Sequence, residues 1–117
     1  MIVPFPLTAT GIAYRVGGTQ SGNVRVGLAR ADGTVYGGSL SVAQNAINTH
    51  QSVPFALTLP LTAGMWYALI QFSSGTGTAW GANNLRGSAT SPGSYVLPTS
   101  ITVPSAATGF IPVMELY

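Results

Sequence analysis

The sequence predicts an all-β protein, folded as a two-sheet antiparallel sandwich of jelly-roll type with about eight strands. Apolar residues recur with a period of two along most of the chain, which is the pattern of half-buried strands. The 15 glycines and 8 prolines are spread through the 117 residues and divide the chain into short segments. No stretch has the apolar spacing of three and four residues that a long helix requires.

The first two strands are expected around residues 12–16 and 24–28, joined by a short loop over 17–22. On each strand one parity is apolar and is assigned to the core: Ile12, Tyr14 and Val16 on the first, Val24, Val26 and Leu28 on the second. Arg30 shares the inward parity but stands at the strand end, where its side chain can reach water. Asp32 and Gly33 then predict a two-residue hairpin turn of type I′, because both residues tolerate positive φ.

Residues 34–43 are expected to form the partner strand, with Tyr36, Leu40 and Val42 facing inward. The pair Gly37-Gly38 interrupts this strand and indicates a bulge or a bend. A polar loop over 44–51 holds His50. In the next strand, the residues on one parity are Val53, Phe55, Leu57 and Leu59, and those on the other are Pro54, Ala56 and Thr58. Because proline cannot donate a hydrogen bond to a ladder, Pro54 predicts that this strand lies at a sheet edge or is locally irregular.

Two later strands, 65–72 and 110–117, are apolar on both parities. Between them lie short extended pieces at 78–80, 95–97 and 101–103 and a long loop over 81–94. The whole chain, 1–117, is expected to be one domain. Residues 1–7 are extended and are consistent with an arm or a linker from a longer chain.

The doubly apolar strands suggest contact with another chain, because a sandwich strand normally has one face in water. The alternative is that loops such as 81–94 cover the second face. Charged residues are depleted from oligomer interfaces, and this chain is only 5% charged, which favours the oligomer. The expected interface residues are Met65, Tyr67, Leu69, Ile111, Val113 and Tyr117.

The acidic residues argue against catalysis. Asp32 and Glu115 are the only carboxylates and His50 is the only imidazole. A glycosidase needs two neighbouring carboxylates, and a serine triad would need His50 to meet one of these acids. Asp32 is already explained by its turn. We therefore expect no enzymatic activity, no metal site and no cofactor.

Nucleic acid and membrane are not expected partners. The basic residues are isolated from one another, whereas nucleic-acid surfaces usually show clustered Lys and Arg; they are Arg15, Arg25, Arg30 and Arg86. The longest apolar run, 65–70, is far shorter than the roughly 20 residues of a membrane span.

A carbohydrate-binding module that uses exposed aromatic residues is the alternative function. Trp80 lies between Gly77 and Gly81, close to a polar loop, and is the best candidate for a sugar-stacking ring. Asn83 and Asn84 follow as candidate polar contacts.

Residues 11–33 resemble a pattern found in tail and fibre proteins of bacteriophages: a strand, a Ser-Gly-Asn turn over 21–23, then a Val-x-Val-Gly-Leu strand over 24–28 that ends in Asp-Gly. Residues 59–69 resemble the companion segment, in which leucine, threonine and glycine precede aromatic residues. The match departs from the pattern at Ala29, where an aromatic is common. It covers about half of the chain.

This resemblance implies a non-enzymatic jelly-roll module of the virion, often trimeric, that serves as a fibre tip, a spike or a head decoration. We accordingly expect a homotrimer that is assembled in the host cytoplasm and carried on the particle. Its partners would be other copies of itself, other virion proteins and a host-surface glycan. The motif positions are turns and core, so no binding residue is carried over.

Overall fold

The computed structural model describes residues 1–74, 76–79, 81–86, 97, 99–101, 108–112 and 114–117, with the backbone alone for 82–86 and 108–112. Within these ranges there are ten strands and no helix. They are β1 (Ile2–Val3), β2 (Leu7–Arg15), β3 (Asn23–Arg30), β4 (Val35–Tyr36), β5 (Val42–Ala43), β6 (His50–Leu61), β7 (Gly64–Phe72), β8 (Gly81–Arg86), β9 (Thr108–Pro112) and β10 (Met114–Leu116). The all-β prediction is confirmed.

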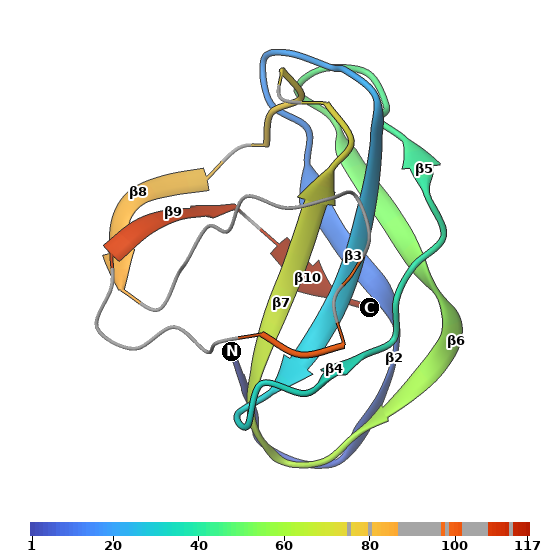
Figure 1. Ribbon diagram of the computed structural model, residues 1–117, viewed down its shortest axis with the longest axis vertical. Coiled ribbons are helices and arrows are strands. Elements are labelled where there is room, and N and C mark those ends of the chain that lie inside the picture. Colours follow the sequence, from blue (N-terminus) through green and yellow to red (C-terminus); the bar gives the residue numbers. More distant parts are fainter. Residues whose placement is uncertain (75, 80, 87–96, 98, 102–107, 113) are drawn as a thin grey trace.

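Eight of these strands form two antiparallel sheets that enclose one core (Figure 1). The first sheet has five strands in the order β1-β7-β3-β4, with β5 also paired to β3. The second has three strands in the order β10-β2-β6. Strands β8 and β9 pair with each other and form a separate two-stranded ribbon. The predicted two-sheet sandwich is therefore confirmed.

The core is best sealed where β3 faces β2. Val24, Val26 and Leu28 of β3 are completely buried, and Ile12 and Tyr14 of β2 are at most 1% exposed. These are the inward parities that the sequence predicts. Burying side chains of this size contributes roughly 1.5–3 kcal/mol each to folding, so this double row supplies much of the hydrophobic stabilisation.

The turn after β3 differs from the prediction. Gly33 has a φ of +89°, whereas Asp32 is not in the positive-φ region. The Gly33 amide donates to the Arg30 carbonyl at 2.9 Å, and the Arg30 amide donates to the Thr34 carbonyl at 2.9 Å. The turn is thus a three-residue loop with glycine in its left-handed position, and the type I′ prediction is wrong. Asp32 Oδ1 accepts from the Thr34 amide at 2.9 Å, which lowers the pKa of this carboxyl.

The predicted bend at Gly37 is confirmed, and it changes which residues face inward. Gly37 has a φ of +57°, and the segment 34–43 is broken there into β4 and β5. Beyond the bend Ser39 is buried, and its Oγ accepts from the Val26 amide at 2.8 Å. Leu40, expected inside, is 70% exposed because the chain is irregular between β4 and β5 and turns Ser39 inward there, whereas Val42 again packs against the core.

Strand β6 is irregular next to Pro54, as the sequence predicts. It is an edge strand, and its register with β2 shifts beside this proline. Phe55 leaves the ladder and forms a bridge with Ser39 of the segment between β4 and β5. Leu57, predicted to face the core, lies in this irregular stretch and is 78% exposed, although it shares the parity of the buried Val53 and Phe55.

A buried polar network ties the loop over 44–51 to the core, and the sequence analysis did not predict it. Gln51 and Gln44 are only 2% and 4% exposed. The Tyr14 hydroxyl donates to Gln51 Oε1 at 3.0 Å and accepts from Gln44 Nε2 at 3.1 Å. Gln51 also donates to the Ala43 carbonyl at 2.7 Å and accepts from the Asn45 amide at 2.9 Å. Each buried amide group is thus paired, which buried polar groups require.

We expect Gly37→Ala to destabilise the fold by about 2–4 kcal/mol, because the new Cβ requires a left-handed backbone and overlaps the Leu59 side chain. Gly18→Ala is the matched control, since a Cβ there meets no atom within 4 Å. The free energy of unfolding in urea measures both. Equal stability of the two variants would contradict the assigned bend.

Candidate oligomer interface

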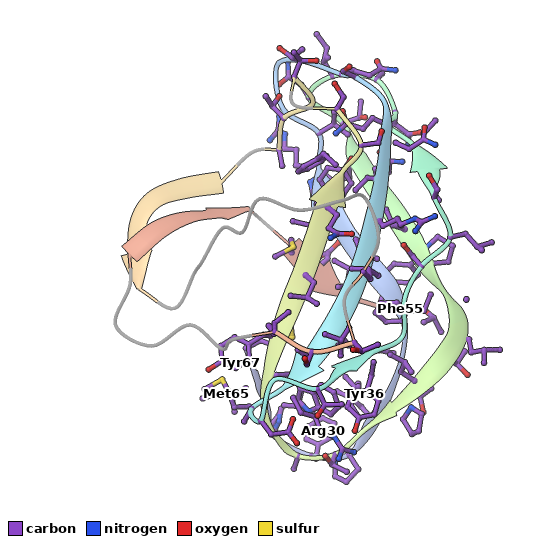
Figure 2. The ribbon with its side chains drawn as sticks, in the orientation of Figure 1. Arg30, Tyr36, Phe55, Met65 and Tyr67 are labelled. Atoms are coloured by element: carbon purple, nitrogen blue, oxygen red, sulfur yellow. The ribbon has the colours of Figure 1, made fainter. Side chains whose placement is uncertain are left out.

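Strand β7 places three predicted interface residues on the outer face of the five-stranded sheet. Met65 is 43% exposed, and Tyr67 and Leu69 are half-buried. Trp66, between them on the strand, is turned into the core and is 2% exposed. Figure 2 shows Met65 and Tyr67 together, at the side of the sandwich opposite Phe55. The structure therefore brings Met65, Tyr67 and Leu69 onto one surface.

The residues of β3 that lie opposite Leu69 and Tyr67 on this outer face are small. Leu69 pairs with Gly27 and Tyr67 pairs with Ala29. Leu97 covers part of the face, because a Cβ on Gly27 would lie 3.3 Å from Leu97 Cδ1. A later segment of the chain thus covers the centre of the face, while the Met65 end remains exposed.

Tyr117 lies on the other sheet, on the outer face next to Gly11. Its amide donates to the Gly11 carbonyl at 3.3 Å, and its carbonyl accepts from the amides of Gly11 and Thr10 at 3.2 and 2.6 Å. Its hydroxyl would lie 2.5 Å from a Cβ on Gly11. Partial burial raises the pKa of the Tyr117 phenol. Tyr117 therefore does not join Met65, Tyr67 and Leu69 in one patch.

For the remaining candidate residues of the interface and of the glycan site, the structure describes either the backbone alone or nothing. Ile111 belongs to β9, opposite Ala82 of β8. Val113 lies outside the described residues. For the glycan alternative, Trp80 also lies outside them, and Asn83 and Asn84 belong to β8, where the register with β9 is irregular. Part of the segment expected as a loop, 81–86, is thus a strand.

One edge of β7 carries backbone groups without a strand partner. The Trp66 amide donates to the Met1 carbonyl at 2.9 Å, away from β3, while the Ser73 amide donates to Asn23 of β3 at 2.9 Å. Backbone groups alternate in direction along a strand, so Ala68, Ile70 and Phe72 point their N–H and C=O groups to the side of Trp66. There β1 pairs with only Gly64 and Met65. No described strand pairs with β7 beyond them on this side.

The core side chains along this edge of β7 are less buried than those of the central strands. Ala68, Ile70 and Phe72 of β7 pack against the core but are only partly buried. The same holds for Met114 and Leu116 of β10, the edge strand of the opposite sheet. The central strands β2 and β3 have inward residues that are at most 1% exposed at Ile12, Tyr14, Val24, Val26 and Leu28. The described strands thus leave an apolar seam along β7.

The titratable residues do not form one site. Arg30 stacks on two aromatic rings, with its guanidinium carbon 4.8 Å from the Tyr36 ring centre and 5.5 Å from that of Trp66. Asp32 follows in the turn after β3. His50 opens β6 opposite Arg15, at the other end of the sandwich. Glu115 is paired with Ala13, and with His50 it borders a small cavity of about 80 Å³.

The described part of the chain contains no group of three or more His, Cys, Asp or Glu side chains that could hold a metal ion. Among the same residues, no helix is long and apolar enough to cross a membrane.

Comparison with known proteins identifies no relative. The chain matches no protein-family model, and no curated protein and no solved structure matches it.

Proposed function

We propose that the chain is a non-catalytic structural and attachment module of a bacteriophage virion that works as a homo-oligomer, with a trimer as the expected assembly. The resemblance of residues 11–33 and 59–69 to phage tail and fibre proteins supports the virion assignment. The β-sandwich fold is compatible with it. The single observation that carries the oligomer is the state of β7, which has apolar residues on both faces and, within the described part of the chain, an edge without a strand partner.

Natural edge strands are protected by charge, proline or a bulge, because an unprotected edge invites another strand. Between Met65 and Phe72, β7 has no charged residue and no proline, and its register with β3 is regular. The partly exposed core side chains along the same edge add an apolar surface, and such surfaces usually mark interaction sites. A second copy of the chain would cover both features at once.

The positions of the acids support a non-catalytic role. Asp32 lies in the turn that follows β3, whereas Glu115 and His50 lie along β10 and at the start of β6, toward the other end of the sandwich. General acid–base chemistry needs such groups within hydrogen-bond reach of one substrate. The exposed position of Asp32 and its lowered pKa are explained by the turn itself.

We expect light scattering at micromolar concentration to give three times the chain mass of 12.0 kDa. Met65→Arg should reduce this mass to that of one chain while the far-UV circular dichroism is kept, because Met65 is 43% exposed and a guanidinium on this end of the outer face of β7 would have to be desolvated in the interface. Leu57→Arg is the matched control, since Leu57 is 78% exposed on β6 and outside the proposed interface. A monomeric parent protein, or equal masses for both variants, would contradict the proposal.

The virion assignment predicts that peptides of this chain are recovered by mass spectrometry from purified particles of the phage that encodes it. They should remain after a salt wash that removes loosely adsorbed protein, because a structural module is held in a stable interface. Presence in the lysate together with absence from washed particles would contradict this assignment.

A further inference from the structure

We propose that the unpaired edge of β7 receives the β8–β9 ribbon of a neighbouring copy of the chain. This inference rests on the proposed self-association and specifies its geometry. Two structural features support it. The β7 edge has no described strand partner from Ala68 to Phe72, and the β8–β9 ribbon pairs with no other described strand.

The edge defines the chemistry of its partner. Ala68, Ile70 and Phe72 present N–H and C=O groups in alternation, so the partner must be an extended backbone that can form a ladder. The side chains of Ala68, Ile70 and Phe72 point toward the core and are apolar, whereas the outer side carries Leu69 and the polar Gln71. A matching strand therefore has to be apolar on its core parity and needs no charged residue on its outer parity.

Strand β9 has this composition. Its residues are Thr108, Gly109, Phe110, Ile111 and Pro112, which include no charge and place apolar residues on both parities. It is five residues long, which is the length of the β7 segment from Ala68 to Phe72. Pro112 lies at its end, where the loss of one donor interrupts a ladder least.

The β8–β9 ribbon has no strand partner in its own sandwich among the residues that the structure describes. Strands β8 and β9 pair with each other and with no other described strand. Figure 1 shows the ribbon projecting away from the two sheets, to the side on which β7 lies. A two-stranded ribbon is at best marginally stable alone in water, so this ribbon needs an additional sheet to pair with. Because it does not pair with the β7 edge of its own chain, a second copy is the source that the structure favours.

The exchange would be head-to-tail, because the ribbon of each copy would pair with the β7 edge of the next copy. Such heterologous contacts close into rings when the rotation between copies permits it, and a ring of three agrees with the expected trimer. Direct pairing of two β7 edges around a two-fold axis would also satisfy the backbone. It would leave both ribbons unpaired, so the geometry favours the exchange.

Site-directed cross-linking tests the contact, and the chain has no cysteine of its own to interfere. Leu69→Cys is placed on β7 and Ile111→Cys on β9, and a short bis-maleimide tolerates a shift in register. We expect a covalent two-chain product when the two variants are mixed, unfolded and refolded together. Each variant alone should stay at the mass of one chain.

Three outcomes would overturn the exchange. A two-chain product from Leu69→Cys alone would show that β7 pairs with β7. A product confined to one chain in the double variant would show that each copy covers its own edge. Absence of any product in a refolded mixture that light scattering shows to be oligomeric would refute the exchange while leaving the proposed self-association intact, whereas a monomeric parent protein would refute both.

A backbone variant gives an independent readout. Ala68→Pro removes a donor that faces the unpaired edge and leaves the β3 ladder complete, so it should yield a folded monomer. Ala68→Ser keeps the amide and should remain oligomeric. An unchanged oligomer mass for Ala68→Pro would overturn the proposed strand addition.

Discussion

The backbone of β7 can form hydrogen bonds on two sides, and among the described residues only one side is satisfied from Ala68 to Phe72. This constraint governs the rest of the account, because an apolar strand cannot leave its polar backbone in a dry environment without a partner. On its satisfied side β7 is held by the regular ladder to β3, which forms the most completely buried part of the core. On its other side no described strand pairs with it beyond Met65, and its inward side chains Ala68, Ile70 and Phe72 are only partly buried.

Elsewhere in the sandwich, one sheet edge and one buried loop are closed by specific contacts. At β6, the bulge after Pro54 allows Phe55 to bridge to Ser39, so that the two sheets are joined along this side. At the end that carries the loop over 44–51, the Tyr14 hydroxyl links the two buried glutamine side chains. It accepts a hydrogen bond from Gln44 and donates one to Gln51. Polar groups are therefore paired where these two segments are buried, whereas the described residues give the β7 edge no strand partner beyond Met65.

Strand parity was sufficient to predict the all-β fold and the inward residues of the first two strands, because those strands are regular. It failed at Leu40 and Leu57, which lie in irregular segments next to Gly37 and Pro54. The parity is disturbed only locally, because Val42 and Leu59 still pack against the core. The buried glutamines were not predictable, because their burial depends on hydrogen-bond partners far away in the sequence. Parity showed that both faces of β7 are apolar, but the unpaired edge follows from strand order, which a single sequence does not contain.

Amide hydrogen exchange along β7, measured residue by residue by NMR in dilute and in concentrated protein, tests the central claim most directly. The amides of Tyr67 and Leu69 face β3 and should exchange slowly at both concentrations. Those of Ala68, Ile70 and Phe72 should exchange rapidly in dilute protein and become protected when copies associate. This alternation within one strand would identify the edge as the interface. Slow exchange of all five amides in a dilute monomer would contradict the account, because the chain would then cover its own edge.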